Sequence, residues 1–519
     1  MDYYSNSRQA AAHRGTTGRA WRLYALFVFV SLTAFPFLFS LFGYSPLQAF
    51  LALALVNICI FPTANYYANG KRGLPALAIL CWSFAIQFGL PFFTREPVFE
   101  LANKNFAYLD DEVVTYALVF CILGSCFFQM GFYLVQKSRL KKALPIVKLH
   151  LDEKKSIVFC LVVGLLLPFV FSAQWLIPSE YILQLSAIIN LLNNQSLVVI
   201  GILGWMVYTK RPPRWLIVAL YALVVVSVVR GFSSTMLEQA VAPIVVFSII
   251  KWSYTGRLPV FVLGVVLFLA LFLSPVKTDF RKQLRYDTPA EQGAVSNAQL
   301  WFEQAANYWA DALSGNRSLE ESTSALTSRT DFLHQFAHIY SLTPSSIDYQ
   351  YGGTYTFFIY TLIPRVIWPE KPLSGTANDY YAITYGVATE ESIKTSTFGV
   401  SLIGESYINF GVYGVIIVMM IQGALIALLQ HVFGSQESGP GGQAVFLAFF
   451  VFFLNGIGSS AEILFGGILQ NLLAGCVLLL WVRGKSPRLP SPKLPATRAP
   501  EMTVQRNQRM TTRYTSAEN

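Results

Sequence analysis

Basic side chains lie directly beside apolar segments from residue 230 to residue 371. Arginine carries a planar guanidinium group that can bind two phosphate oxygens at once. Arg365 lies between Pro364 and Trp368, where proline restricts the backbone. A cluster of such cations at one membrane face fits a ligand with a pyrophosphate head and an apolar tail. The alternative is that each side chain only reaches the lipid headgroups. The other cations of this group are Arg230, Lys277, Arg281, Lys282, Arg285, Arg329 and Lys371.

Two histidines, His334 and His338, are four residues apart, and Asp331 precedes the first by three residues. On a helix this spacing brings the side chains to one face, where they can hold a metal ion. The glutamate of the HExxH pattern is missing, and Phe332 and Phe336 give the segment an apolar face. We therefore favour a structural role over a general base, a sugar-binding group or a metal site.

The elements that must position these residues are membrane helices. The chain has 519 residues, of which 54% are hydrophobic and 13% charged, a composition typical of a multi-pass membrane protein. A helix crosses the hydrocarbon layer with about 20 apolar residues. Twelve runs of about this length are found, at 23–42, 47–65, 74–93, 113–135, 156–177, 194–209, 215–229, 236–250, 258–276, 411–432, 443–460 and 463–482.

The positions of Lys and Arg predict the orientation of these helices. If the N-terminus is cytoplasmic, the cytoplasmic segments hold 26 Lys and Arg, whereas the short outer loops hold 3. Short cytoplasmic loops are enriched in these residues, so we expect both termini in the cytoplasm. The net charge of +10 therefore faces an anionic lipid surface, and we expect no nucleic-acid partner.

The predicted fold class is an all-α polytopic membrane protein of about twelve transmembrane helices, with a large outer-face loop domain that contains amphipathic helices. In the loop, Trp301, Ala305 and Tyr308 recur at helical spacing. Its many aromatic residues favour a domain lying on the outer leaflet over a soluble domain with an aromatic core. The predicted parts are a cytoplasmic segment 1–22, transmembrane helices 23–276, the outer loop domain 277–410, transmembrane helices 411–482 and a disordered basic cytoplasmic tail 483–519.

The predicted spans contain no Lys or Arg, and the acids Glu238, Glu405 and Glu462 stand at or near their ends. Ion-coupled transporters usually keep an ionisable residue near the membrane midplane. We therefore expect the chemistry at the outer boundary of the membrane. The six cysteines all fall within predicted spans, so no disulfide framework is expected.

Two segments of this outer region resemble a known family. "YGGTYTFFIYTLIPRVIWPEKP" (351–372) and "GESYINFGVYGVII" (404–417) are similar to segments of the bacterial oligosaccharide repeat-unit polymerases, the Wzy-type enzymes of O-antigen and exopolysaccharide assembly. The resemblance implies an inverting glycosyltransferase that needs neither metal nor cofactor. Its substrates would be polyprenyl-pyrophosphate-linked oligosaccharides at the outer face of the bacterial inner membrane. A flippase and a chain-length regulator are the partner proteins that it implies, beside membrane lipids.

The resemblance also implies roles for particular residues. Cations would stabilise the departing pyrophosphate, and a carboxylate or histidine would take the proton of the acceptor hydroxyl. Glu405 could alternatively hold the loop to the helices through a salt bridge. The candidates for the first role are Arg230, Arg281, Arg285, Arg329, Arg365 and Lys371, and those for the second are Glu405, Asp331, His338 and Asp379.

Two other functions stay open from the sequence. An O-antigen ligase, which transfers a finished glycan to the lipid A core, shares the plan of spans and outer loop, and His338 would then matter more. A flippase or transporter of the same lipid-linked sugar predicts internal repeats and charge within the spans, and neither is found in the sequence.

Overall fold

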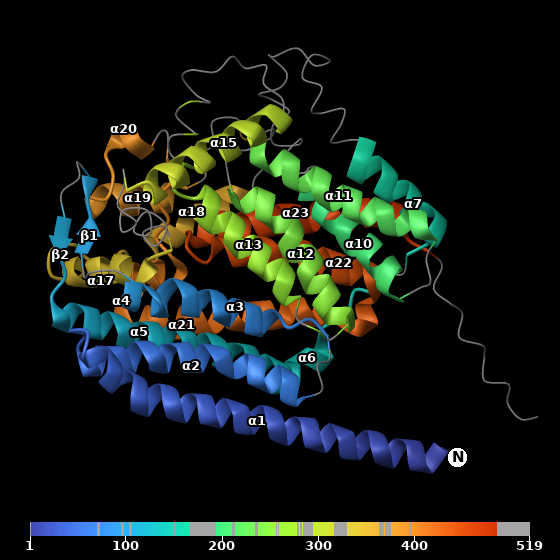
Figure 1. Cartoon of the computed structure of the whole chain (residues 1–519), viewed down its shortest axis with the longest axis horizontal. Coiled ribbons are helices and arrows are strands. Elements are labelled where there is room, and N and C mark those ends of the chain that lie inside the picture. The colour runs from blue at the N-terminus through green and yellow to red at the C-terminus, as the bar shows by residue number, and fades with distance from the viewer. Residues whose placement is uncertain are drawn as a thin grey trace, which may run out of the picture. The chain divides into compact units, whose positions relative to one another are not determined.

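The computed structural model is built from helices, with one two-stranded hairpin. It describes residues 2–69, 73–94, 98–102, 106–149, 151–166, 194–209, 213–233, 237–255, 257, 259–277, 280, 283, 294–315, 330–362, 368, 375–393 and 396–484. Residues 485–519, which hold nearly all of the predicted tail, lie outside these ranges. The α-helices before the loop region are α1 (Asp2–Ser40), α2 (Pro46–Ala68), α3 (Ala76–Phe84), α4 (Pro91–Thr94), α5 (Asp111–Lys137), α6 (Leu140–Ala143), α7 (Glu153–Leu161), α10 (Ser196–Thr209), α11 (Arg214–Ser233), α12 (Leu237–Thr255) and α13 (Val260–Leu273) (Figure 1).

The second part of the chain continues with shorter helices before three long ones. The hairpin pairs β1 (Val98–Glu100) with β2 (Phe106–Tyr108) and is the one described exception to the predicted all-α class. Short π-helical turns follow α3 and α7, and a 3-10 turn, η6 (Gln436–Ser438), precedes α22. The remaining α-helices are α15 (Ala294–Leu313), α17 (Phe332–Leu342), α18 (Gly353–Leu362), α19 (Thr376–Thr384), α20 (Glu390–Ile393), α21 (Leu402–Val432), α22 (Gly439–Gly456) and α23 (Ala461–Val482).

The length and composition of these helices define a membrane-embedded α-helical protein. Within the described residues, eight helical segments are long and apolar enough to cross a membrane, and Ser196–Thr209 and Val260–Leu273 are shorter apolar helices. The class of fold predicted from hydropathy is therefore confirmed. The count of twelve spans stays a prediction, because the run predicted at 156–177 extends beyond the described residues.

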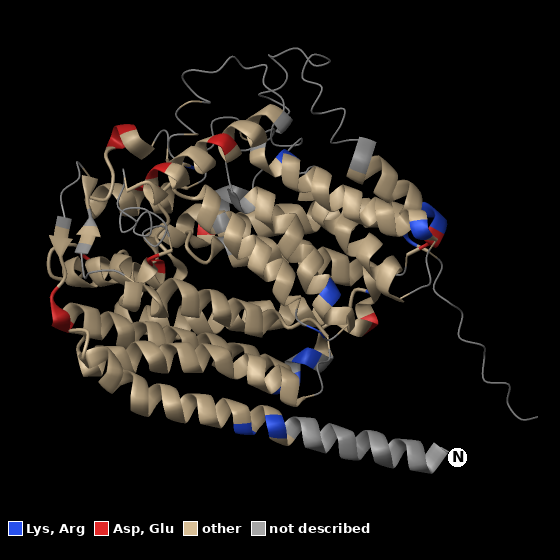
Figure 2. Cartoon of the chain, viewed as in Figure 1, with Lys and Arg blue, Asp and Glu red and all other residues tan. Residues whose placement is uncertain are grey.

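Charged side chains separate along the helix axes. α5 shows this within one helix, since it begins with Asp111 and Glu112 and ends with Lys137. Figure 2 shows most described Lys and Arg toward one end of the long helices and most Asp and Glu toward the other. We call these the basic end and the acidic end. The acidic end carries α17, α19 and α20, which belong to the predicted outer loop domain.

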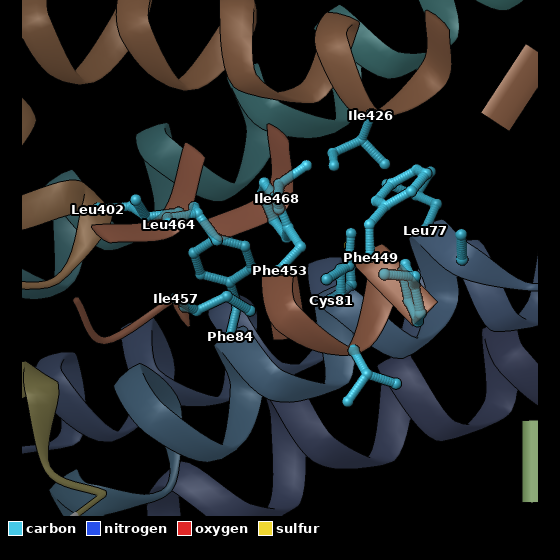
Figure 3. Close-up of a cluster of buried hydrophobic side chains, with 14 of the residues drawn as sticks. Leu77, Cys81, Phe84, Leu402, Ile426, Phe449, Phe453, Ile457, Leu464 and Ile468 are labelled. Atoms are coloured by element: carbon cyan, nitrogen blue, oxygen red, sulfur yellow. The ribbon is translucent and has the colours of Figure 1, made fainter. Parts of the chain in front are cut away.

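The helices α5 and α21 pack closely against each other. At Gly131 of α5, an added methyl group would overlap the carbonyl oxygen of Met420, and at Gly423 of α21 it would overlap the carbonyl oxygen of Phe128. Small residues let two helix backbones approach where lipid supplies no hydrophobic driving force. An apolar core joins α21 to α3, α22 and α23, as Figure 3 shows for Leu77, Cys81, Phe84, Leu402, Ile426, Phe449, Phe453, Leu464 and Ile468.

The amphipathic helix predicted from Trp301, Ala305 and Tyr308 is α15, and these three residues are buried. The Trp301 ring stacks on Phe280 with centroids 4.6 Å apart, and its indole nitrogen donates to the carbonyl oxygen of Leu273 at 3.2 Å. The aromatic face of α15 therefore packs on the ends of α11 and α13. The Trp301 side chain is thus enclosed by protein. The position of the loop domain on the outer leaflet stays a prediction.

Trp301→Phe is expected to lower the free energy of unfolding by about 1 kcal/mol or more. Phenylalanine keeps the ring contact but leaves the Leu273 carbonyl oxygen unpaired, at a cost of about 1–3 kcal/mol. The midpoint of thermal unfolding in detergent measures the change. It is followed by the aggregation of the protein, a signal that does not depend on tryptophan fluorescence. Leu313→Ala in the same helix is the control, because Leu313 is 79% exposed. Equal midpoints for Trp301→Phe and the wild type would contradict the assigned hydrogen bond.

The chain interrupts helical geometry inside α21, at Phe410 and Gly411. Gly411 has φ +58°, a conformation that glycine adopts without steric cost. The interruption falls where the tenth predicted span begins, at residue 411. It separates a short helical segment, 402–409, from the long apolar part of α21.

Candidate functional site

Glu405 lies in that short segment and is 1% exposed. Ser401 caps the segment with its side chain and has φ +62°, which is uncommon for a residue with a Cβ atom. One carboxylate oxygen of Glu405 accepts a hydrogen bond from Thr354 Oγ1 at 2.9 Å, and the other accepts from the Ala461 backbone nitrogen at 2.6 Å. Glu405 thus ties the first turn of α18 and the first residue of α23 to α21.

Asn409 completes the contact between α18 and α21. Its amide nitrogen donates to Thr354 Oγ1 at 2.7 Å and to the Glu405 carbonyl oxygen at 2.8 Å, and its Oδ1 accepts from the Gly352 nitrogen at 3.0 Å. The Thr354 hydroxyl therefore receives one hydrogen bond and donates another, which fixes its proton toward Glu405. A fully paired polar network of this kind holds a single arrangement of the backbone.

A second buried carboxylate follows directly after Ala461. Glu462 is 2% exposed and accepts from the backbone nitrogens of Gly375 at 3.2 Å and Ala377 at 3.4 Å, at the start of α19. Negative charge is stabilised at a helix N-terminus, where backbone N–H groups have no partner in the helix. Gly375 has φ +108°, so glycine is needed there. Glu462 is near the end of a predicted span but is not among the predicted site residues.

Asn378 joins α19 to the same region. Its amide nitrogen donates to Ser459 Oγ at 3.1 Å, and its Oδ1 accepts from the Val400 nitrogen at 3.2 Å. Asn378 is fully buried. We refer to Thr354, Asn378, Glu405, Asn409 and Glu462 together as the acid cluster. It lies where α18, α19, α21 and α23 meet.

The acid cluster contains one predicted base, Glu405, whose two carboxylate oxygens already accept hydrogen bonds. A side chain that is 1% exposed does not reach a sugar hydroxyl in this conformation. The geometry is that of a positioning residue. The predicted alternative, a loop held to the helices through Glu405, agrees with these contacts, although the partners are a hydroxyl and a backbone nitrogen instead of a cation.

Asp379 lies beside the acid cluster, in the first turn of α19 and next to Asn378. It is partly exposed, and burial raises the pKa of its carboxyl group above the ordinary value. A carboxylate that is more basic than usual and open to solvent can take a proton from a hydroxyl group. Of the four predicted bases, Asp379 is therefore the one that is both partly exposed to solvent and adjacent in sequence to a residue of the acid cluster.

Asp331 and His338 have structural partners in and around α17. Asp331 caps the helix, with Oδ1 accepting from the His334 backbone nitrogen at 3.0 Å and Oδ2 lying 2.8 Å from His334 Nδ1. His338 Nε2 donates to the Tyr385 carbonyl oxygen at 3.0 Å, and its ring stacks on Phe99. Within the described residues no group of three or more His, Cys, Asp and Glu could hold a metal ion. These contacts agree with the structural role favoured from the sequence.

Acid is expected to destabilise the protein partly through His338. Burial lowers the pKa of its imidazole, while the hydrogen bond to Tyr385 opposes that shift. In the pH range between the lowered pKa and about 6.5, the unfolded chain binds a proton that the folded chain does not. The contribution of His338 to the free energy of unfolding is therefore fully present above about pH 6.5 and falls as the pH decreases. His338→Gln keeps a donor for Tyr385 without titrating, so its unfolding temperature should vary less between about pH 8 and 5. An unchanged pH dependence would contradict this assignment.

The structure describes one of the six predicted pyrophosphate ligands. Arg230 lies in the last turn of α11, two residues before Phe232, which packs on Trp301. It is thus on a different element from those that build the acid cluster. The other five, Arg281, Arg285, Arg329, Arg365 and Lys371, lie outside the described residues. The cationic part of the site stays a prediction.

Comparison with known proteins assigns the chain to one protein family. The chain matches, over residues 96–485, the family described as Domain of unknown function (DUF8712), and it is a member of that family. The matched region begins just before β1 and includes every residue of the acid cluster. No curated protein and no solved structure matches the chain.

Proposed function

We propose that this protein is a membrane-embedded glycosyltransferase that polymerises polyprenyl-pyrophosphate-linked oligosaccharide units into O-antigen or exopolysaccharide. It acts at the outer face of the bacterial inner membrane, with both termini in the cytoplasm and twelve crossings. The acidic end of the bundle is then the outer end. This placement follows from the enrichment of Lys and Arg in the short loops of the opposite end.

One observation carries the proposal. The two segments that resemble repeat-unit polymerases, 351–372 and 404–417, bind each other through their side chains and backbones. Thr354 donates to Glu405, and the backbone nitrogen of Tyr351 donates to the carbonyl oxygen of Asn409 at 3.0 Å. Gln350, the residue before the first segment, donates from its backbone nitrogen to the carbonyl oxygen of Ile408 at 2.9 Å. Segments about fifty residues apart that carry the resemblance thus form one structural unit at the acidic end.

In the proposed reaction, a hydroxyl oxygen of the acceptor sugar attacks the anomeric carbon of the donor glycan. The bond between that carbon and the pyrophosphate oxygen breaks with inversion, and the hydroxyl proton passes to Asp379. The polyprenyl pyrophosphate leaves with the bonding electron pair, and the predicted cations stabilise its charge. Glu405 and Glu462 hold α18, α19 and α23 in register, and the apolar helices receive the isoprenoid chain.

Deletion of the gene, followed by sizing of the surface polysaccharide on a gel, tests the proposal. Loss of a polymerase leaves single repeat units on the cell surface. Expression of the gene from a plasmid in the deletion strain should restore the long chains. A complete absence of surface glycan would instead indicate a ligase. Accumulation of lipid-linked units on the cytoplasmic side would indicate a flippase. Unchanged long chains after deletion would overturn the proposal.

A further inference from the structure

The basic end of the bundle contains a cavity of about 620 Å³ that the proposed transferase reaction does not use. Its lining comes from separate parts of the chain. Lys137 is in the last turn of α5, Lys141 is in α6, and Lys148 is in the segment that follows α6. His431 comes from the last turn of α21, and Glu437 from the turn before α22.

The backbone that carries Lys148 is fixed to the neighbouring elements. The Val147 nitrogen donates to the Val432 carbonyl oxygen at 3.1 Å, and the Leu149 nitrogen donates to the Ser438 carbonyl oxygen at 2.9 Å. Lys148 is therefore held between two anchored residues. A cavity wall built in this way is largely formed before a ligand arrives, as is usual for small-molecule sites.

The charge around the cavity is unbalanced. Three lysines face one acidic side chain, Glu437, and none of the lysines forms an ion pair within the part of the chain that the structure describes. The Nε2 atom of His431 is buried and has no hydrogen-bond partner among the described residues. Unpaired positive charge beside an unsatisfied ring nitrogen is suited to an anion that accepts hydrogen bonds.

The position of the cavity indicates where that anion comes from. α5 and α21 are both candidate membrane spans, of 27 and 31 residues, and the cavity lies at the end of both. The end of a spanning helix lies at the depth of the lipid headgroups. Basic pockets between membrane helices on the cytoplasmic side bind the phosphate groups of anionic lipids.

We propose that this cavity binds the phosphate group of an anionic phospholipid through Lys137, Lys141 and Lys148, with His431 as a further hydrogen-bonding group. The volume of the cavity exceeds that of a phosphate ion and leaves room for the glycerol part of a headgroup. The bound lipid joins the end of α5 to the end of α21 and stabilises their contact. This site is separate from the acid cluster, because none of the five acid-cluster residues lines the cavity. Figure 1 shows α19, which contributes Asn378 to the cluster, and α6 toward opposite ends of the long helices.

The test uses the full-length protein, purified in detergent and titrated with phosphatidylglycerol, phosphatidylcholine or inorganic phosphate. Native mass spectrometry counts bound lipid, and thermal unfolding measures stabilisation. The double variant Lys141→Gln/Lys148→Gln is compared with Lys154→Gln/Lys155→Gln. The second pair is a matched control, because it removes the same charge from exposed lysines of α7 that do not line the cavity.

We expect one phosphatidylglycerol to bind the wild type and the control, and phosphatidylcholine to bind neither. Affinity of the Lys141/Lys148 variant should fall by about 30-fold, since each lysine near an anionic lipid contributes about a fivefold factor. Stabilisation by inorganic phosphate, lost in the same variant, would support the anion site and assign it to a free phosphate. Equal losses in both double variants, or no binding of either phosphate compound, would overturn the proposal.

Discussion

Glu405→Ala is expected to abolish polymer formation while the protein is still made. The substitution removes both acceptors at once and leaves the Thr354 hydroxyl and the Ala461 nitrogen buried without their partner. Each such loss costs about 1–3 kcal/mol and frees α18 and α23 to move against α21. A displacement of about 1 Å at a reacting site can lower the rate about 100-fold. Polysaccharide length on a gel, in cells that lack the chromosomal gene, measures the effect.

Glu405→Gln removes only part of the hydrogen bonding of this carboxylate, which accepts from Thr354 and from the Ala461 nitrogen. Its amide oxygen can accept from one of the two donors, so the local fold is kept better than in Glu405→Ala, and chains of intermediate length are expected. Glu391→Ala is the control, because Glu391 is exposed in α20 and outside the acid cluster. Full-length polymer from Glu405→Ala at normal protein level would refute the role of Glu405 as a positioning residue.

Gly423→Ala is expected to give the largest loss of stability. The new methyl group would overlap the carbonyl oxygen of Phe128, and backbone on α5 cannot rotate away as a side chain can. Overpacking costs about 1–3 kcal/mol, and we expect a value at or above the upper end because the whole α5–α21 contact must widen. The thermal unfolding temperature of the purified protein and its yield from membranes both measure this.

Gly467→Ala in α23 provides the comparison, since a methyl group there would meet no atom within 4 Å. Alanine also has the better helix propensity, so Gly467→Ala should be neutral or slightly stabilising. Gly131→Ala, on the facing surface of α5, should resemble Gly423→Ala. If Gly423→Ala and Gly467→Ala unfold at the same temperature, the close approach of α5 and α21 is wrong.

Patterns of burial along one segment were readable from the sequence. Spacing alone identified the helix α15 and the face that carries Trp301 and Ala305, and hydropathy identified the long membrane helices. The start of the predicted span at residue 411 coincides with the helix interruption at Gly411. These features depend on the periodic exposure of neighbouring side chains, which a single segment records.

Contacts between distant segments were not readable in the same way. From the sequence, Glu405 was predicted to be a base or an ion-pair partner. Its hydrogen-bond donors are instead the Thr354 hydroxyl and the backbone nitrogen of Ala461. Every residue except proline has a backbone N–H group, so residue types do not show which of these groups a side chain binds. Neither the contact of Glu405 with Ala461 nor that of Glu462 with the start of α19 could therefore be predicted. For His338, the apolar neighbours in the sequence favoured a structural role, and its contacts with Tyr385 and Phe99 agree with that interpretation.

Purified protein tests most directly whether, as proposed, this chain itself joins lipid-linked sugar units. Cells that lack the gene supply the substrate, because they are expected to accumulate single lipid-linked units that can be extracted. The purified full-length protein, reconstituted in lipid with these units, is then followed by mass spectrometry of the glycans. We expect a ladder of chains that grow by one repeat unit, with release of polyprenyl pyrophosphate and no added metal or cofactor. Units that stay single in the presence of folded, wild-type protein would contradict it.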